Sequence, residues 1–205
     1  MTQPLEIEIK YLITDPTGLR KTITDLGWTS EGKYFEYNIR FEDENEGLYQ
    51  KRQLLRLRKD NKNILTFKSK SNQKSEFYKI RREIEVTVSD FEAMRSIIRE
   101  LGFRHEQIYE KWRETFRVGP SVICLDHMPF GHFMEIEGPE DDITTLSNTL
   151  GFSPLQGIKA NYLTLFSFIK KKAGLPFNDV TFEHFKTVSI DFTNDLRSFE
   201  TGSAQ

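Results

Sequence analysis

Residues 5–10 read Leu-Glu-Ile-Glu-Ile-Lys, a strict alternation of apolar and charged side chains. Successive side chains of an extended chain point to opposite faces, so this stretch predicts a β-strand, which we expect to run to Ile13. One face of that strand is aliphatic, and the other carries Glu6, Glu8 and Lys10. The stretch therefore predicts a sheet with one apolar face and one charged face.

Charged side chains recur at every second position in further segments. They are Arg56 and Arg58; Lys68 and Lys70; Arg81, Glu83 and Glu85; Lys111 and Arg113; and Glu135 and Glu137. For any single strand, exposure to solvent explains a charged face well. Across all the segments, however, a solvated face would also carry Thr, Ser, Asn and Gln, whereas these positions hold almost only Glu, Lys or Arg. The pattern therefore favours charged faces that line the inside of the protein.

Eight extended segments are predicted, and eight strands are enough to close a small barrel. They cover residues 5–13, 34–41, 53–59, 64–70, 78–88, 108–118, 121–126 and 132–137. Helices are predicted over 15–26, from a capping box at Ser89 to Leu101, and over 141–150, each ending in Leu-Gly-aromatic, and a last helix is broken at Gly174. The predicted fold is α+β, a closed eight-stranded antiparallel β-barrel with helices packed outside.

Length and composition indicate one main domain. The chain has 205 residues, enough to bury one substantial core but fewer than two ordinary domains need. We expect this domain to span residues 1–172. Residues 173–205 are expected to form a C-terminal extension that docks partly through aromatic side chains, with a frayed end at 201–205. The docking side chains are Phe182, Phe185 and Phe192.

Charge and cysteine content exclude several classes of function. A formal net charge of -2 provides no basic field, so no nucleic-acid partner is expected. Charged residues interrupt the apolar N-terminal segment, so we expect no signal peptide, no membrane association and a cytoplasmic location. The lone Cys124 fits a reducing compartment and is expected to pack on the apolar side of its strand or at the margin of that side, and no Cys/His cluster has zinc-site spacing.

A lumen lined by charged side chains needs partners for them, because burying an unpaired ion is costly. A polyphosphate together with divalent cations would supply both signs of charge. The planar guanidinium of Arg donates two parallel hydrogen bonds to a phosphate, and Lys adds a compact charge. Carboxylates at alternate positions offer the oxygen ligands that Mg²⁺ or Mn²⁺ prefers.

At these residues the sequence resembles a known family. The segment from Glu6 to Lys10 resembles the N-terminal ExExK signature of the CYTH superfamily, also called triphosphate tunnel metalloenzymes, and the resemblance covers about residues 4–172. The segments that resemble the family in the same order are 55–58, 65–68, 81–85, 111–113, 125–126 and 133–137. Family members often carry a Ser-Tyr pair in the last helix, where this chain has Asn161-Tyr162, so the resemblance assigns no role to Tyr162.

The resemblance also implies site residues. The implied metal ligands are Glu6, Glu8 and Glu137, with Glu135, Asp126, Glu83 and Glu85 as further ligands or orienting groups. The implied phosphate-binding residues are Lys10, Arg56, Arg58, Lys68, Arg81, Lys111, Arg113 and Lys159. Glu8 and Lys68 are both candidates for accepting the proton of an attacking water.

The resemblance implies hydrolysis of a triphosphate with Mg²⁺ or Mn²⁺, and a homodimer is compatible with it. Inorganic triphosphate, thiamine triphosphate and nucleoside triphosphates are the candidate substrates, and catalysis would rest on positioning and charge neutralisation.

Two other functions fit the same pattern. Class IV adenylyl cyclases resemble the family but use the ribose 3′-hydroxyl in place of water, and some carry a His-Phe pair just before ExExK, which residues 1–5 lack. The second alternative is a non-catalytic module that binds polyphosphate or a nucleotide. The carboxylates of Glu6, Glu8, Glu135 and Glu137 argue against it, because loss of activity would first remove metal ligands.

Overall fold

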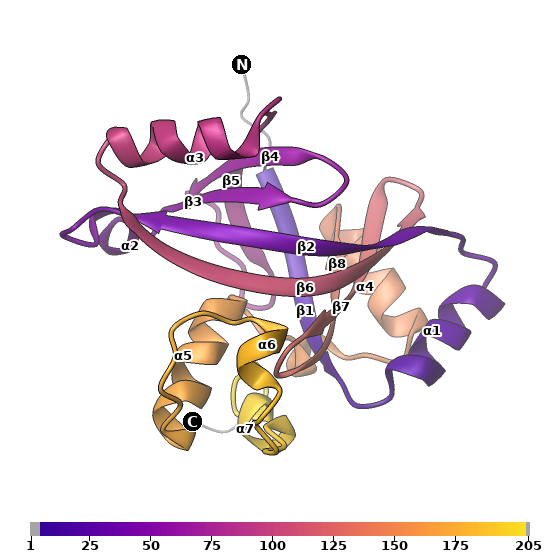
Figure 1. The fold of residues 1–205 in the computed structure, drawn as a ribbon. Coiled ribbons are helices and arrows are strands. Elements are labelled where there is room, and N and C mark those ends of the chain that lie inside the picture. Colours follow the sequence, from indigo (N-terminus) through magenta and orange to yellow (C-terminus); the bar gives the residue numbers. More distant parts are fainter. Residues whose placement is uncertain (1–4, 204–205) are drawn as a thin grey trace.

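The computed structural model describes residues 5–203, and its eight strands form a closed antiparallel barrel in the order β1-β5-β4-β3-β2-β6-β7-β8 (Figure 1). The strands are β1 (Leu5–Ile13), β2 (Ser30–Glu42), β3 (Leu54–Lys59), β4 (Asn63–Lys70), β5 (Lys79–Thr87), β6 (His105–Val118), β7 (Ser121–Met128) and β8 (Gly131–Glu137). The predicted fold class is confirmed, and every predicted strand is present with ends that differ by a few residues.

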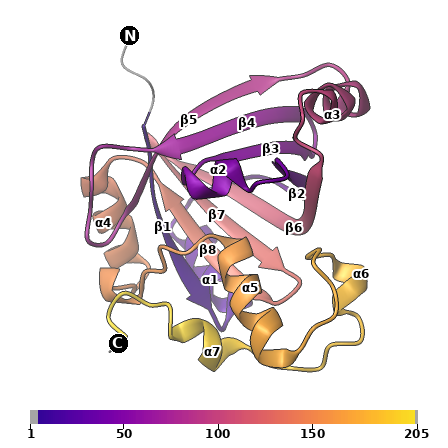
Figure 2. The same cartoon turned by 90° about the vertical axis from the view of Figure 1, so that its left-hand side faces the viewer.

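Helices lie against the outside of the barrel wall. They are α1 (Pro16–Asp25), α2 (Gly47–Gln50), α3 (Phe91–Glu100), α4 (Glu140–Thr149), α5 (Tyr162–Ala173), α6 (Phe182–Phe185) and α7 (Thr193–Arg197), with a 3-10 turn at Pro154–Gln156. Figures 1 and 2 show α3 on one side of the barrel, α1 and α4 on another, and α5 to α7 on a third. Within residues 5–203, no helix has both the length and the apolar character needed to cross a lipid bilayer.

Helix ends follow the predicted capping chemistry with one correction. The N-cap of α3 is Asp90 rather than Ser89, because the Asp90 carboxylate accepts a hydrogen bond from the Ala93 amide at 2.9 Å. After α1, α3 and α4 the chain turns at a glycine in the left-handed region, where a side chain would be strained. These glycines are Gly27, Gly102 and Gly151, with φ of 81°, 100° and 80°.

The strand register sets which side chains share the lumen. Glu8 lies opposite Lys79 on β5 and opposite Glu137 on β8, and the next inward residue, Lys10, lies opposite Glu135. The aliphatic residues between them point outward and pack under α1 and α4. The barrel therefore has an apolar outside under the helices and a charged inside, as the alternating pattern predicts.

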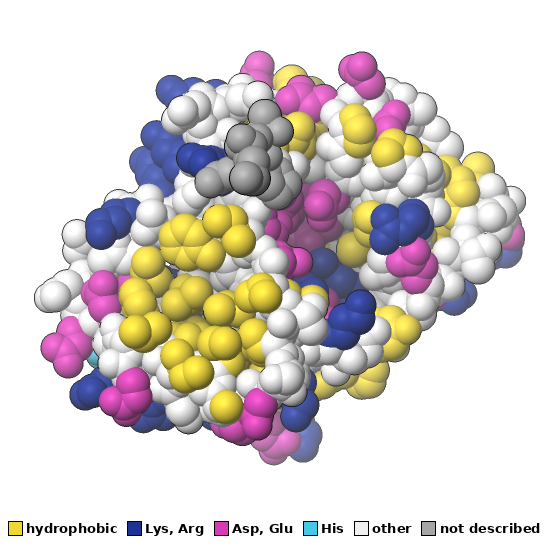
Figure 3. Space-filling model, turned by 90° about the horizontal axis from the view of Figure 1, so that it is seen from above, with side chains coloured by type: hydrophobic (Ala, Val, Ile, Leu, Met, Phe, Trp, Pro, Cys, Tyr) yellow, Lys and Arg dark blue, Asp and Glu magenta, His cyan; other side chains and the backbone are white. Residues whose placement is uncertain are grey.

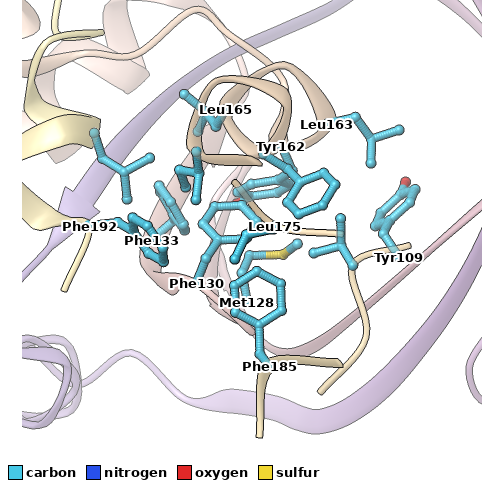
Figure 4. Close-up of a cluster of buried hydrophobic side chains, with 14 of the residues drawn as sticks. Tyr109, Met128, Phe130, Phe133, Tyr162, Leu163, Leu165, Leu175, Phe185 and Phe192 are labelled. Carbon is cyan, nitrogen blue, oxygen red and sulfur yellow. The ribbon is translucent and has the colours of Figure 1, made fainter. Parts of the chain in front are cut away.

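The C-terminal extension packs against the barrel wall. Phe185 and Phe192 are buried in one apolar cluster with Met128, Phe133 and residues of α5 (Figure 4). The predicted domain boundary at residue 172 falls inside α5, and it stays a prediction.

The end that is expected to fray begins at Thr201. The Thr201 amide donates to the Gly157 carbonyl at 2.9 Å, and the Gly202 amide donates to the Leu155 carbonyl at 2.7 Å. Residues 204–205 lie outside the described part of the chain.

Candidate functional site

The barrel encloses a cavity of about 460 Å³ whose lining comes from all eight strands and from the start of α5. Figure 3 shows acidic and basic side chains together in the hollow on one face of the molecule. Nine acidic and seven basic residues line the cavity. With both signs present in nearly equal number, the cavity is suited to an anionic ligand accompanied by cations.

Most of the predicted site residues meet in this cavity. Its lining includes Glu6, Glu8, Glu83, Glu85, Glu135 and Glu137, and also Lys10, Arg56, Arg58, Lys68, Lys111 and Arg113. Three predicted residues are placed elsewhere. Asp126 is buried behind the lining, Arg81 borders a second hollow, and the Lys159 ammonium donates to the Ser75 and Glu76 carbonyls at 2.6 and 3.0 Å.

Asp126 is the centre of a buried hydrogen-bond network. Its carboxylate accepts from Arg113 through two bonds of 2.6 Å, from Lys111 at 3.0 Å and from the Tyr162 hydroxyl at 2.7 Å. The side chain of Asp126 has no exposed surface, and both of its oxygens are engaged. Asp126 therefore orients the cationic groups beside it rather than meeting a ligand directly.

Negative charge is concentrated where β1, β5 and β8 meet. The Lys68 ammonium donates to both oxygens of Glu6 at 2.6 and 2.7 Å, and Lys79 bonds Glu8. Burial opposes ionisation of Glu8, but Lys79 and further lysines lower its pKa to about 2. Glu8 is therefore ionised at neutral pH.

Two further carboxylates of this group hold protons unusually tightly. Burial, followed by repulsion from Glu6 and Glu8, raises the pKa of Glu137 to about 7. Burial also raises the pKa of Glu83 to about 8, with added repulsion from Glu6 and Glu85. At neutral pH Glu83 is therefore mostly protonated and Glu137 about half protonated, and a cation that binds them displaces these protons.

The chemistry of these residues fits a divalent metal ion. All the donors are carboxylate oxygens, which are the preferred ligands of Mg²⁺ and Mn²⁺. Among residues 5–203, no three His, Cys, Asp or Glu side chains already converge on one point. Glu6 and Glu8 bond Lys68 and Lys79 instead, so metal binding requires these side chains to turn.

Several buried polar atoms of the barrel interior lack a hydrogen-bond partner among the described residues. They include both amide atoms of Asn38 and the Nε atom of Arg56. Asn38 is fully buried and lies opposite Arg58 on β3 and Tyr109 on β6. Because buried polar groups are normally paired, these atoms indicate room for a polar ligand or ordered water inside the barrel.

The model of the CYTH domain family matches residues 4–152, well over half of the chain. The chain belongs to the CYTH domain family. A protein of Methanocaldococcus jannaschii named "Putative adenylate cyclase" is 30% identical over 148 residues, which make up 71% of this chain and 83% of that protein. The family resemblance of the sequence is thereby confirmed.

Solved structures share the CYTH fold. A structure from Vibrio parahaemolyticus, described as a "putative adenylate cyclase", has a TM-score of 0.72 and 18% sequence identity. The match covers 81% of this chain and 99% of the Vibrio chain. A structure from Hippeastrum, described as a "putative adenylyl cyclase" with a dominant triphosphatase activity, has a TM-score of 0.53 and 16% sequence identity. The match covers 79% of this chain and 95% of the Hippeastrum chain. CYTH proteins are usually enzymes of the triphosphatase or cyclase type, and they generally use divalent metals to bind triphosphates.

Helix α5 of this CYTH protein contributes Tyr162 to the cavity. Asn161 is the N-cap of α5, where its side chain accepts a hydrogen bond from the Thr164 amide at 2.8 Å, a capping role that Ser also fills. The Tyr162 ring lies under the ammonium groups of Lys10 and Lys111, 4.1 and 5.4 Å from its centroid. Tyr162 thus positions two predicted phosphate-binding lysines as well as Asp126.

Sequence reasoning missed four charged residues that line the CYTH cavity, Glu31, Glu36, Asp60 and Lys79. Lys79 stands two positions before Arg81 on β5, and Glu36 faces inward from β2. Burial raises the pKa of Glu36, but the nearby charges of Lys111 and Arg113 outweigh burial and lower that pKa to about 2. Glu36 and Lys79 lie inside the predicted strands 34–41 and 78–88, and the period-two rule places Lys79 on the same face as Arg81.

The expected position of Cys124 was wrong. Cys124 shares its strand face with Asp126 and lines the cavity rather than the apolar side. Side chains two positions apart lie on one face of a strand, so the inward Asp126 turns Cys124 inward as well.

Proposed function

We propose that this CYTH protein is a divalent-metal-dependent hydrolase of a triphosphate. The observation that carries the proposal is the meeting, in one cavity, of a group of glutamate side chains and a wall of arginines and lysines. A triphosphate with bound cations complements both parts, because its oxygens suit the cationic wall and its metal ions suit the carboxylates.

Glu6, Glu8 and Glu137 are the proposed metal ligands, with Glu83, Glu85 and Glu135 nearby as further ligands or orienting groups. Bound Mg²⁺ or Mn²⁺ would draw off negative charge that develops on the phosphate oxygens. The carboxylates of Glu8 and Glu137 lie on directly opposed residues of neighbouring strands, which supports a shared ion between them.

The proposed phosphate-binding groups are those that line the cavity. They are Lys10, Arg56, Arg58, Lys68, Lys111 and Arg113. Arg113 is held by bidentate bonds to Asp126, and Lys10 by the Ala160 carbonyl at 3.0 Å. Donors fixed in this way bind phosphate oxygens with little loss of side-chain freedom, and they stabilise charge in the transition state without reorganising.

Of the two candidates for accepting the proton of the attacking water, only Glu8 is unprotonated at neutral pH, although its pKa of about 2 makes it a weak base. Burial alone would lower the pKa of the Lys68 ammonium, but Glu6 and Glu8 raise it above its ordinary value. Lys68 therefore stays protonated at neutral pH and serves as a charge for phosphate, whereas Glu8 is ionised.

The test is to incubate the purified protein with Mg²⁺ or Mn²⁺ and, separately, inorganic triphosphate, thiamine triphosphate and ATP. Orthophosphate, pyrophosphate and cyclic AMP are measured together. Orthophosphate release supports the hydrolase and ranks its substrates. Glu8→Gln is expected to abolish turnover while triphosphate binding persists, with the exposed Glu44→Gln as a matched control that keeps wild-type rates.

An adenylyl cyclase is the second candidate, because the relative with 30% identity carries that name. Release of cyclic AMP and pyrophosphate from ATP would indicate that the reaction in this cavity is cyclisation and not hydrolysis. Tight triphosphate binding without any turnover would instead indicate a binding module.

A further inference from the structure

A short part of the C-terminal extension, residues 178–182, lies along β6 beyond the end of β7, and we call it the docking segment. Within the described part of the chain, the pairing of β7 with β6 ends at Trp112. β2 pairs with β6 over its whole length on the other side. Val180 of the docking segment forms a parallel bridge to Tyr109 of β6. The docking segment therefore completes the barrel wall at the position of Tyr109.

Hydrogen bonds of 2.8–2.9 Å hold the docking segment to β6. The Val180 amide donates to the Ile108 carbonyl, and the Glu110 amide donates to the Val180 carbonyl. The Asp179 carboxylate accepts from the Ile108 amide. Two further bonds join the Gln107 side chain to the Asn178 carbonyl and the Phe182 amide to the Glu110 carboxylate. The backbone on both sides of Tyr109 is thereby fixed by the extension.

Tyr109 links this docked backbone to the cavity. Its ring is buried in the apolar cluster that holds Phe185 and Phe192 of the extension (Figure 4), and its side chain also lines the cavity. The Tyr109 hydroxyl accepts a hydrogen bond from the Arg56 guanidinium at 3.3 Å. Among residues 5–203, no group accepts the O–H proton of Tyr109. The hydroxyl can therefore orient Arg56 and donate to a ligand oxygen at the same time.

We propose that Tyr109 is a further ligand-binding residue of the cavity, and that the docking segment positions it. The inference rests on the proposed function, in that the ligand is a triphosphate, whose oxygens accept the free Tyr109 proton. A donor that is held in place before binding loses little side-chain freedom when the ligand arrives. The docking segment lies outside residues 4–152, which match the CYTH model, so this support of the cavity comes from outside the matched domain.

Tyr109→Phe tests the binding role, because it keeps the ring in the apolar cluster and removes only the hydroxyl. Binding of inorganic triphosphate to the full chain is measured by calorimetry in Mg²⁺. The affinity is expected to fall about tenfold, since a hydrogen bond to a charged group is worth about that factor. Wild-type affinity in Tyr109→Phe would overturn the role of Tyr109.

Substitutions of Asp179 test the positioning role. Asp179→Ala removes the acceptor of the Ile108 amide and should weaken triphosphate binding about threefold. Asp179→Asn keeps a side-chain oxygen at that place and should bind as wild type does. The matched control is Asp195→Ala, which also removes one carboxylate from the extension but one that pairs with Lys172. This control should leave the affinity unchanged.

A double variant separates positioning from a general loss of stability. In the Tyr109→Phe background, Asp179→Ala should weaken binding no further, because the docking segment acts through the Tyr109 hydroxyl. Additive effects of the two changes would overturn the positioning role. Equal weakening by Asp179→Ala and Asp195→Ala would overturn it as well.

Hydrogen exchange tests the docking segment without any ligand. The amides of residues 107–110 should exchange faster in Asp179→Ala than in Asp195→Ala, and equal rates would contradict the positioning role. Neither readout depends on turnover. The expected order of affinities without hydrolysis would contradict the proposed hydrolase alone, whereas a wild-type protein that binds no triphosphate would overturn the binding role of Tyr109.

Discussion

Replacing Glu137 by Gln is expected to stabilise the metal-free protein at alkaline pH. Glu137 lies opposite Glu8 on the neighbouring strand, and its pKa is raised from 4.5 to about 7 by burial and by repulsion from Glu6 and Glu8. Glutamine keeps the size and polarity of the side chain but removes the charge. The repulsion within the carboxylate group should then decrease.

The pKa shift sets the size and the sign of this effect. The full shift corresponds to at most about 3.4 kcal/mol. Because the Glu137 side chain is more than a third exposed, solvent screening reduces the expected effect to about 1 kcal/mol. The folded protein binds the Glu137 proton more tightly than the unfolded chain does. The contribution of Glu137 to stability is therefore largest below its unfolded pKa and is lost as pH rises through about 7.

Urea unfolding in EDTA at about pH 5 and about pH 8 measures the effect. Glu137→Gln should exceed wild type in free energy of unfolding by about 1 kcal/mol at the higher pH, with a smaller difference at the lower pH. Saturating Mg²⁺ should reverse the order, because wild type retains the full carboxylate set and a ligand of the folded state stabilises it. A Gln variant no more stable than wild type at pH 8 without metal would refute the reasoning. Glu44→Gln, exposed and distant from the group, should change little.

Single contacts lead to three further predictions. Tyr162→Phe removes a hydrogen bond to the buried Asp126 side chain, which also bonds Arg113 and Lys111. This change should lower the free energy of unfolding by about 1.5–3 kcal/mol in a urea titration, and a loss below about 0.5 kcal/mol would contradict the network. Burial raises the pKa of Cys124 to about 11, so a thiol-reactive dye should label the native protein far more slowly than the unfolded one, and equal rates would count against its buried position. Arg56→Ala should raise KM for the triphosphate about tenfold. Lys159→Ala should change KM less than about twofold, because the Lys159 ammonium bonds loop carbonyls and not the cavity. The opposite ranking of the two variants would place Lys159 in the site.

The alternation of side chains along the strands is enough to predict most of the barrel. At residues 5–10 a period of two assigns each side chain to a face, and that assignment needs only local backbone geometry. The same rule places Glu135 and Arg113 inside the barrel. The rule also applies to Cys124, which lies two positions before the inward Asp126 and therefore faces inward as well. The predicted position of Cys124 was wrong because it followed from the apolar neighbours Ile123 and Leu125, which lie on the opposite face.

Which of the inward charges meet depends on the tertiary structure. Contacts such as Lys79 with Glu8 and Tyr162 with Asp126 join residues 71 and 36 positions apart. They depend on strand order and register, which a period-two pattern does not specify. Lys159 shows the limit most clearly, since its side chain reaches carbonyls 84 and 83 positions away rather than the lumen. Local alternation in the sequence assigns the faces of the strands, and barrel closure brings particular charges on those faces close enough to pair.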